Sequence, residues 1–169
     1  MDKNQIVLKL NSICSGTVLE AGEFGRSGVV SVWIESKTVL QIAECLKNDL
    51  EFQLDWLENL SVVELEEVVV VTYFLRSTTT PETLVLRISA LPGSKSEKIV
   101  FPSVSSIWPM AIPFENEAEQ LFGVTFIGKE SCELNNKFLL PDLSHGFPLR
   151  KSFDFSSTGS APIQNGGHS

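Results

Sequence analysis

The chain has little of the side-chain chemistry that holds metal ions and clusters. Its 169 residues include three cysteines, at Cys14, Cys45 and Cys132, and two histidines. The cysteines are isolated and no Cys-x-x-Cys pair occurs, whereas zinc sites and iron–sulfur clusters use closely spaced ligands of this kind. We therefore expect buried, reduced thiols, and neither a metal ion nor an iron–sulfur cluster on this chain.

Motifs for catalysis and for nucleotide binding are also lacking. Nucleophilic catalysis needs a nucleophile within reach of a base, but the histidines are His145, which adjoins Ser144 only in sequence, and His168 in a polar tail. A His145 that faces solvent or a partner is favoured over a catalytic one. The glycines between Gly22 and Gly28 (GEFGRSG) lack the Lys-Ser/Thr of a phosphate-binding loop. We expect no catalytic and no cofactor-binding residue here.

Positive charge and long apolar runs are scarce as well. Thirteen Lys and Arg residues against 21 Asp and Glu give a formal net charge of −8, which disfavours nucleic acids and anionic lipid surfaces as partners. The longest apolar run, around residues 68–75, is far shorter than the ~18 residues of a membrane-spanning helix. The first residues lack the charged-then-apolar layout of a secretory signal. Any membrane contact is expected to run through other proteins.

The length and composition of the chain suit one folded domain, because hydrophobic residues make up 43% of it. Helical spacing of Ile6, Leu10 and Ile13 predicts a first helix. A second helix is predicted from an N-cap at Ser36 to about residue 49. Its apolar face would consist of Val39, Leu40, Ala43, Leu46 and Leu50.

Strands are predicted at four places by alternating or continuous apolar residues. They are residues 18–20, 29–34, 67–76 and 83–91. The last two are joined by a short polar loop, which predicts an antiparallel hairpin. Residues 52–60 have a less regular pattern, and residues 98–104 are expected to be extended. This order of elements predicts an α+β fold with a mixed β-sheet and helices packed on one side, followed by an extended C-terminal segment.

A third helix is predicted, and Pro109 and Pro113 bracket its start, because proline is tolerated in a first helical turn. Gly123 suits the position after its last residue. Its buried stripe would consist of Phe114, Ala118, Leu121 and Phe122. We expect three parts in the whole chain: an α+β domain at 1–142, an extended partner-docking strip at 143–153, and a polar, glycine-rich, disordered tail at 154–169.

Three carboxylates, Glu115, Glu117 and Glu119, mark the third helix. Acids near a helix start are favoured by its dipole, while the pair Glu115 and Glu119, four residues apart, repels. The simplest interpretation is that these carboxylates lie on a solvent-exposed face of the helix. A metal site is disfavoured because no histidine or further aspartate lies at ligand spacing. The sharper hypothesis is that a basic partner surface neutralises Glu115 and Glu117.

The strip contains apolar and basic groups side by side. Pro148 keeps Phe147 out of the helical conformation, so we expect an extended segment that presents Phe147 and Leu149 next to Arg150 and Lys151. So few residues form no core, and they need a groove either in this domain or on another protein. The residues alone leave both options open.

Residues 106–153 together resemble the 30 kDa subunit family of respiratory complex I, whose bacterial members are the C subunits of NADH:quinone oxidoreductase. The matching positions are Glu115, Glu117, Leu121, Phe122, Gly123, Phe126, Gly128, Leu140, Asp142, Gly146, Pro148, Leu149, Arg150 and Lys151. The sequence departs from the family pattern at a second set of positions. They are Asn116 in place of Arg, Gln120 in place of Asp, Lys129-Glu130 in place of His-Pro, and Phe147 in place of His.

The resemblance implies a scaffold subunit without catalytic residues, in the peripheral arm of a proton-pumping NADH:quinone oxidoreductase. It implies the 49 kDa-type subunit and other peripheral-arm subunits as partners, with FMN and iron–sulfur clusters on those partners and no cofactor on this chain. It also implies a peripheral location on the cytoplasmic side of the inner membrane. Two alternatives remain: the equivalent subunit of a complex I-related membrane-bound [NiFe] hydrogenase, and a stand-alone adaptor with this fold.

Overall fold

The computed structural model describes residues 2–66, 68–91, 99–129 and 146–153. The elements of the first half are α1 (Lys3–Ile13), β1 (Val18–Glu23), β2 (Val30–Ile34), a short 3-10 turn η1 (Ser36–Thr38) and α2 (Val39–Asn48). Those of the second half are β3 (Trp56–Leu65), β4 (Val68–Arg76), β5 (Thr83–Ala90), β6 (Ile99–Pro102), α3 (Ala111–Phe122) and β7 (Val124–Ile127).

Five strands form one mixed sheet in the order β1-β2-β5-β4-β3. The pairs β1–β2, β4–β5 and β3–β4 are antiparallel, whereas β2 and β5 run parallel. The β4–β5 hairpin is the one predicted from its polar loop, and Ser77 N donates to Glu82 O across that turn. Parallel β2 and β5 need a long connection, which α2, β3 and β4 supply.

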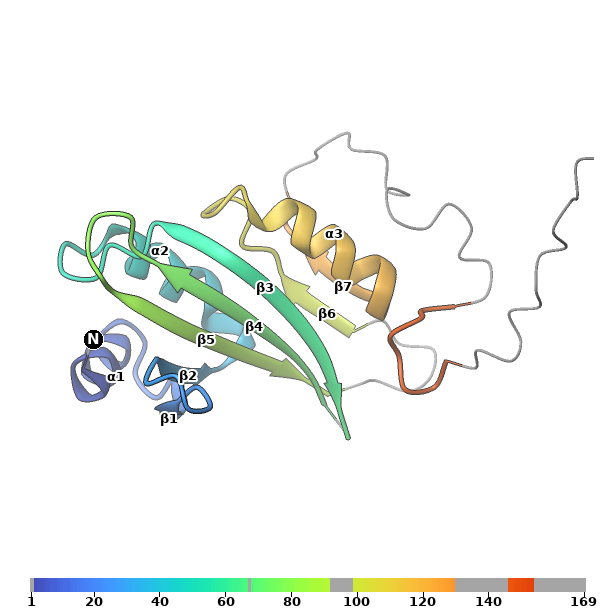
Figure 1. The fold of residues 1–169 in the computed structure, drawn as a ribbon, viewed down its shortest axis with the longest axis horizontal. Helices are drawn as coiled ribbons and strands as arrows, with labels where there is room; N and C mark the ends of the chain where they lie inside the picture. The colour runs from blue at the N-terminus through green and yellow to red at the C-terminus, as the bar shows by residue number, and fades with distance from the viewer. Residues whose placement is uncertain (1, 67, 92–98, 130–145, 154–169) are drawn as a thin grey trace, which may run out of the picture.

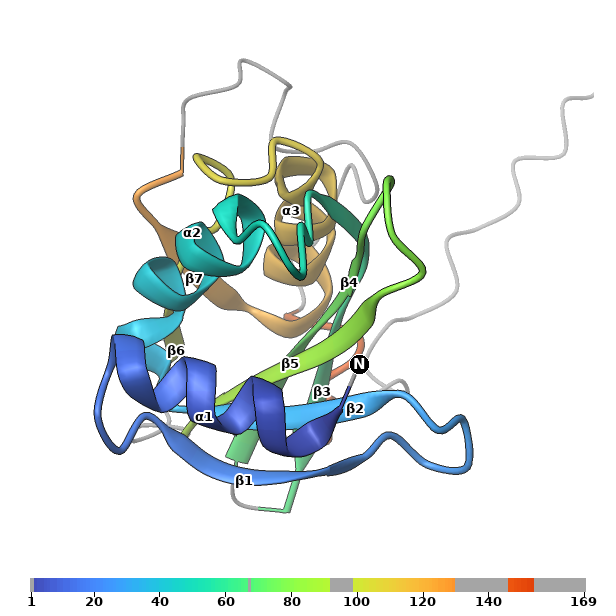
Figure 2. The same ribbon diagram turned by 90° about the vertical axis from the view of Figure 1, so that its left-hand side faces the viewer.

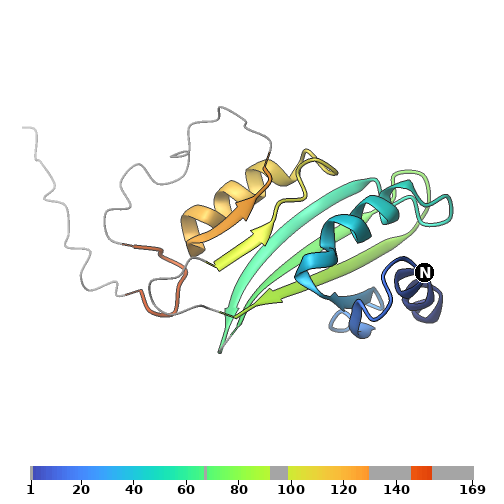
Figure 3. The same cartoon turned by 180° about the vertical axis from the view of Figure 1, so that it is seen from behind.

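All three helices contribute to one core on a single face of this sheet. Seen from the front, the surface formed by β3, β4 and β5 has no helix before it (Figure 1), whereas from behind α2 crosses the sheet (Figure 3). The side view places the helices to one side of the strands (Figure 2). Fully buried Ile6, Leu10 and Ile42 from the helices share one hydrophobic core with Leu86 and Tyr73 of the central strands. The predicted α+β architecture with helices on one side is confirmed.

A second unit, β6–α3–β7, packs beside this sheet at its β3 end. Strands β6 and β7 pair in parallel, with Phe101 opposite Phe126, and α3 provides the crossover between them. Trp108 joins the unit to the loop before β3: its ring is buried, and its Nε1 donates to Leu54 O at 3.1 Å. The β–α–β path thereby positions α3 against β3 (Figure 1).

Several local predictions were wrong. The irregular 52–60 segment contains the start of β3, a ten-residue strand with a bulge between Leu57 and Asn59, and this bulge shifts the period on which strand recognition depends. Ser36 begins the 3-10 turn instead of capping α2. Leu50 lies beyond α2 with 88% of its surface exposed. Strand β7 was not predicted, and the proposed tail at 154–169 lies outside the described residues.

Candidate partner-docking site

The predicted site residues lie on α3 and on the strip that returns to it. Helix α3 contains Pro113 in its first turn, as proline's lack of an N–H allows. It ends where predicted: Gly123 adopts the left-handed conformation, with φ of 64°, and its N–H bonds to Glu119 O. Glycine adopts this conformation without steric cost. The three acids of α3 therefore have fixed positions around a well-terminated helix.

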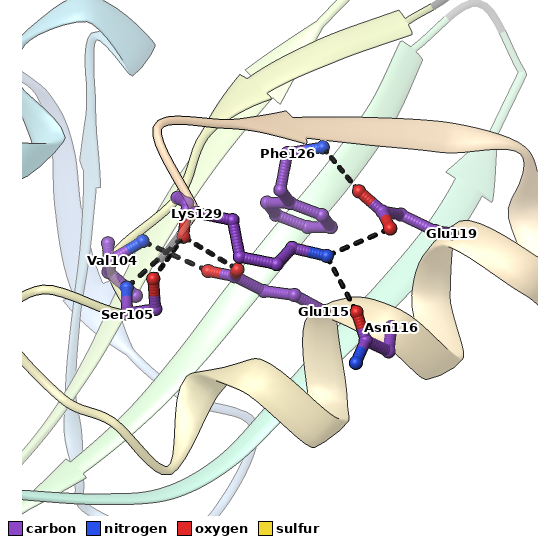
Figure 4. A network of polar contacts seen from close by, with 8 residues as sticks. Val104, Ser105, Glu115, Asn116, Glu119, Phe126 and Lys129 are labelled. Atoms are coloured by element: carbon purple, nitrogen blue, oxygen red, sulfur yellow. Dashed lines mark hydrogen bonds and ion pairs between the residues drawn. The ribbon is translucent and has the colours of Figure 1, made fainter. Parts of the chain in front are cut away.

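Glu115 points into the protein and is completely buried (Figure 4). One of its carboxylate oxygens accepts from Val104 N at 2.9 Å, and the other accepts from the Ser103 hydroxyl at 2.7 Å. The Ser103 Oγ also lies 2.8 Å from the Ser105 Oγ. Both hypotheses that exposed Glu115, a solvated helix face and a basic partner surface, are therefore wrong. The carboxyl instead fastens α3 to the loop that follows β6.

Burial decides the electrostatics of this group. Removal from water raises the pKa of Glu115 above its ordinary value, while the hydrogen bonds from Ser103 and Val104 act in the opposite direction. Tyr73, at the centre of β4, is fully buried close by, and burial followed by the influence of Glu115 raises the pKa of its hydroxyl. That hydroxyl has no hydrogen-bond partner among the described residues. The Glu115 carboxyl and the Tyr73 hydroxyl are therefore two buried polar groups close to each other in the core beside α3.

Glu119 is engaged on a neighbouring side of the helix (Figure 4). It accepts from Phe126 N at 2.9 Å and forms an ion pair with Lys129 Nζ at 2.8 Å. Lys129 also donates to Asn116 Oδ1 at 2.7 Å. These contacts join α3 to β7 and to the residue that follows Gly128. The repulsion expected between Glu115 and Glu119 is offset, because each carboxylate has its own donors.

Glu117 alone among the three acids faces solvent. It remains available to a partner, and its predicted role in docking is untested by these contacts. The helical period of the sequence could have distinguished the buried Glu115 from the exposed Glu117. Glu115 lies four residues after Ala111 and three before Ala118, both of which are buried, so it shares their face. Glu117 lies on the opposite side.

The strip is described from residue 146 to 153, and it is not extended. Two successive turns form, in which Arg150 N bonds to Phe147 O and Phe153 N bonds to Arg150 O. The strip lies against its own domain: Leu149 N donates to Leu121 O at 3.0 Å, at the end of α3. Pro148 excludes a helix before it but permits such turns. The expectation of an extended segment is therefore wrong for these residues.

Arg150 makes the strongest contact of the strip with the domain. Its Nε donates to Phe122 O at 2.6 Å, and its Nη1 lies 3.5 Å from Glu64 Oε1. Both side chains of this ion pair are largely buried, at 18% and 15% exposed. Lys151 N donates to the other Glu64 oxygen at 2.8 Å. Arg150, a member of the predicted docking strip, thus anchors the strip to the end of α3 and to β3 of its own domain.

The remaining strip side chains face outward. Phe147 lies over Gly123 so closely that a Cβ at Gly123 would overlap its ring, yet 42% of Phe147 is exposed. Leu149 is 50% exposed, and Lys151 is also exposed. These three, with Glu117, are the predicted docking residues that another protein could reach. The expected domain boundary at residue 142 lies outside the described residues.

Within the described parts of the chain, no group of three or more His, Cys, Asp or Glu side chains is arranged to hold a metal ion. Nor does that part contain a helix long and apolar enough to cross a membrane. Cys14 and Cys45 are free thiols, and Cys132 lies outside the description. Around α3, the polar side chains Glu115, Asn116 and Glu119 are used in contacts within the domain.

The family model described as "Respiratory-chain NADH dehydrogenase, 30 Kd subunit" matches residues 32–159, well over half of the chain. The chain belongs to this family. The match includes most of β2 and all of β3, β4 and β5 in the main sheet, the whole β6–α3–β7 unit and the strip. The recognition made from residues 106–153 is confirmed, and it extends upstream to the sheet.

Curated relatives agree with the family assignment. The NADH-quinone oxidoreductase C subunit from Roseiflexus sp. (strain RS-1) is 29% identical over 154 residues, which cover 89% of this chain and 83% of that protein. The C subunit of the same enzyme from Azorhizobium caulinodans is 40% identical over 72 residues, which cover 42% of this chain and 31% of that one.

Two solved structures share the fold. One is a chain of the membrane-bound sulfane sulfur reductase, an archaeal respiratory membrane complex, with a TM-score of 0.71 at 18% identity; the match covers 92% of this chain and 88% of that one. The other is a trypsin-resistant fragment of Nqo5, with a TM-score of 0.58 at 17% identity, covering 78% of this chain and all of the fragment.

Two departures from the 30 kDa family pattern are in contact with each other. Asn116 stands where the pattern has arginine, and Lys129 stands where it has histidine; here the Lys129 ammonium bonds to both Asn116 and Glu119. The cation beside Glu119 therefore comes from the residue after Gly128 and not from α3 itself. These changes fall within the domain, so they do not by themselves indicate an altered partner surface.

Proposed function

We propose that this chain is the C subunit of an NADH:quinone oxidoreductase and serves there as a scaffold without catalytic residues. In such an enzyme, electrons pass from NADH through FMN and iron–sulfur clusters on other subunits to quinone. The family match over residues 32–159 carries the proposal. The chain itself would lie in the peripheral arm of that complex, on the cytoplasmic side of the inner membrane.

The chemistry of the matched residues supports a structural role. Glu115 and Arg150 belong to the residues by which the family is recognised, and each bonds to atoms of this same domain. Glu115 holds the loop after β6, and Arg150 satisfies a backbone carbonyl at the end of α3, where a cation is favoured. A group engaged in this way is a poor candidate for binding substrate. These two family-defining residues therefore stabilise the fold of this chain.

The partner surface would then be formed by what remains exposed around α3. Glu117, Phe147, Leu149 and Lys151 are the reachable members of the predicted docking set. The 49 kDa-type subunit is the proposed neighbour, together with other subunits of the peripheral arm. Exposed aromatic and aliphatic groups next to single charges are typical of interface positions that exclude water and set the register.

A related complex is the second candidate, because one structural neighbour is a chain of an archaeal sulfane sulfur reductase. Purification of the tagged full chain from host membranes separates the candidates. Companions that bind flavin and NADH are expected; a [NiFe] large subunit or sulfur reductase subunits would assign the chain to a related complex. A chain that elutes alone, with matched tagged controls intact, would favour a stand-alone adaptor.

The purified, folded chain is also predicted to contain no prosthetic group. The measurement is iron, zinc and flavin content per mole of chain, taken together with the absorbance spectrum. Substoichiometric traces are expected. One mole of any of them per mole of chain, retained through gel filtration, would contradict the prediction of a cofactor-free scaffold. Iron or flavin in that amount would also indicate electron-transfer chemistry on this subunit, which zinc, being redox-inert, would not.

A further inference from the structure

The sheet has a second face, opposite the helices, with a chemistry of its own. Strand register identifies its members, because residues directly opposite in paired strands share a face: Trp33 lies opposite Arg87, and Arg87 lies opposite Thr72. With the loop residue Phe24, which folds over them, we call the following residues the outer sheet face. They are Phe24, Ser31, Trp33, Val63, Val70, Thr72, Phe74, Val85 and Arg87. By the same register, polar residues border them on this side of the sheet: Glu20, Asn59, Ser61, Thr83 and Ser89.

No described helix covers this face. It looks toward the viewer in Figure 1 and away from the helices in Figure 2. It is nevertheless rich in apolar groups: Val70 and Val85 are nearly buried, Trp33 and Phe74 are half-buried, and Val63 is 44% exposed. An antiparallel sheet face that meets only water usually has polar residues on it. An apolar patch bordered by polar residues is typical of a surface that another protein covers.

Arg87 lies at the centre of this face and is held by aromatic rings. Its guanidinium carbon lies 4.8 Å from the ring centroid of Phe24 and 5.1 Å from that of Trp33. Phe24 is in turn fixed by an edge-to-face contact with Phe74, with centroids 5.4 Å apart at 88°. Such stacking orients a guanidinium and leaves its outer edge free to form hydrogen bonds.

The charge of Arg87 has no carboxylate partner within the described residues. None of their ion pairs includes it, and its buried Nε has no hydrogen bond. The rings attract the cation, but they cannot satisfy its N–H donors, which fit the two oxygens of a carboxylate. A half-buried, preoriented cation without a carboxylate is therefore a position that an incoming acid would complement.

We propose that the outer sheet face is a docking surface for a segment of a partner protein that places an Asp or Glu carboxylate on Arg87. Apolar side chains of that segment cover Trp33, Phe74 and Val63. Arginine and tryptophan are the residues most often found at the energetic centre of protein interfaces. A free anion would satisfy the charge but would leave the apolar rim in water, so the occupant is a protein.

This inference rests on the proposed function only for the identity of the partner, which is a subunit of the same complex. The outer sheet face is separate from the strip, which lies at α3 and at Glu64, so the chain would have two contact regions. A scaffold that bridges two neighbours needs two such regions. A second copy of this acidic chain is the competing occupant, and the experiment distinguishes it.

The test begins with membranes of a host strain that lacks the chain. Purified full-length chain is titrated onto them, and the concentration for half-maximal retention after sedimentation is measured. Arg87→Met keeps an apolar side chain and removes the guanidinium group. We expect the concentration for half-maximal retention to rise at least tenfold for this variant. Arg87→Lys should give an intermediate loss, because a point charge cannot bond bidentately. Lys37→Met, which removes one exposed cation elsewhere, should change it less than twofold.

A photo-crosslinking amino acid in place of Val63 provides a second readout that does not depend on the folding of Arg87 variants. We expect a crosslink to a peptide of another subunit that contains Asp or Glu, whereas the same reagent at exposed Leu8 on α1 should not give that product. A crosslink to a second copy, or none, would overturn the proposal. Equal retention of Arg87→Met and wild type would overturn it too.

Failure of the proposed function looks different in the same assay. If the wild-type chain is not retained by the membranes, the assignment to the complex is wrong, whatever Arg87 does. If the wild type is retained and saturates, but the Arg87 and Val63 results match their controls, only the outer sheet face is excluded as the docking surface. Thermal unfolding of each isolated variant shows whether a loss of retention reflects a loss of folding.

Discussion

Replacement of Glu115 by alanine is the sharpest test of the α3 network. The change removes both hydrogen bonds of a completely buried carboxyl. Val104 N–H is then left buried without a partner, which costs about 1–3 kcal/mol. The buried γ-methylene group is lost as well, at about 0.8 kcal/mol. Ser103 keeps its neighbour Ser105, so its hydroxyl adds little.

These contributions sum to a destabilisation of about 2 kcal/mol for Glu115→Ala, once the relief from no longer burying a carboxyl is subtracted. In a chain of this size each kcal/mol corresponds to about 2–4 °C in Tm, so a decrease of about 4–8 °C is expected in thermal unfolding at pH 7. Glu117→Ala is the matched control on the exposed side of the same helix and should stay within about 0.5 kcal/mol. Equal losses for both variants would refute the inward orientation of Glu115.

The same carboxyl predicts a dependence on pH. Burial raises the pKa of Glu115 in the folded chain, so the folded state binds its proton more tightly than the unfolded state does. That stabilisation is fully present below the unfolded pKa of about 4.3 and is lost as pH rises through the higher, folded pKa. Glu115→Gln imitates the protonated group permanently. The free energy of unfolding of Glu115→Gln should therefore increase relative to that of the wild type as pH rises. A difference that stays constant with pH would contradict a raised pKa of Glu115 in the folded chain.

Two further changes examine how the strip returns to α3. Gly123→Ala forces alanine into the left-handed conformation, at a cost of about 1–2 kcal/mol, and displaces the Phe147 ring. The midpoint of urea unfolding should therefore fall to a lower urea concentration. An unchanged midpoint would exclude the close contact between Gly123 and Phe147. Arg150→Met removes the bonds to Phe122 O and Glu64, worth about 1.5–3 kcal/mol. Because the strip can detach alone, hydrogen exchange of its amides should accelerate while the Tm of the domain changes little; slow exchange in the variant would oppose this.

The overall architecture could be predicted because its elements follow simple periods. The β4–β5 hairpin combined two strong apolar patterns with a short polar loop, and Gly123 stood where a helix end needs a left-handed residue. β3 was obscured by its bulge, which interrupts the alternation at Leu57. β7 has only four residues, and its position depends on pairing with β6, a contact that no local pattern reports.

The site was harder to predict because its polar contacts connect distant parts of the chain. Glu64 on β3 accepts from Arg150, and Ser103 donates to Glu115. No helical or strand period relates the two positions of either pair. Charge alone suggested that Glu115 faces outward. Its inward orientation depends on donors that only the folded arrangement brings to it, and sequence spacing does not reveal them. The family resemblance located the right helix and strip, but not which of their side chains remain exposed.

The most direct test of the scaffold assignment is NADH:quinone electron transfer in membranes from a strain that lacks this chain. We predict that the activity is lost with the chain and returns when purified, cofactor-free full-length chain is added back. Flavin and iron–sulfur signals of the partner subunits should be present throughout in the restored membranes. Activity that persists without the chain, or that returns only when the added chain has been loaded with a metal or flavin, would contradict the scaffold assignment.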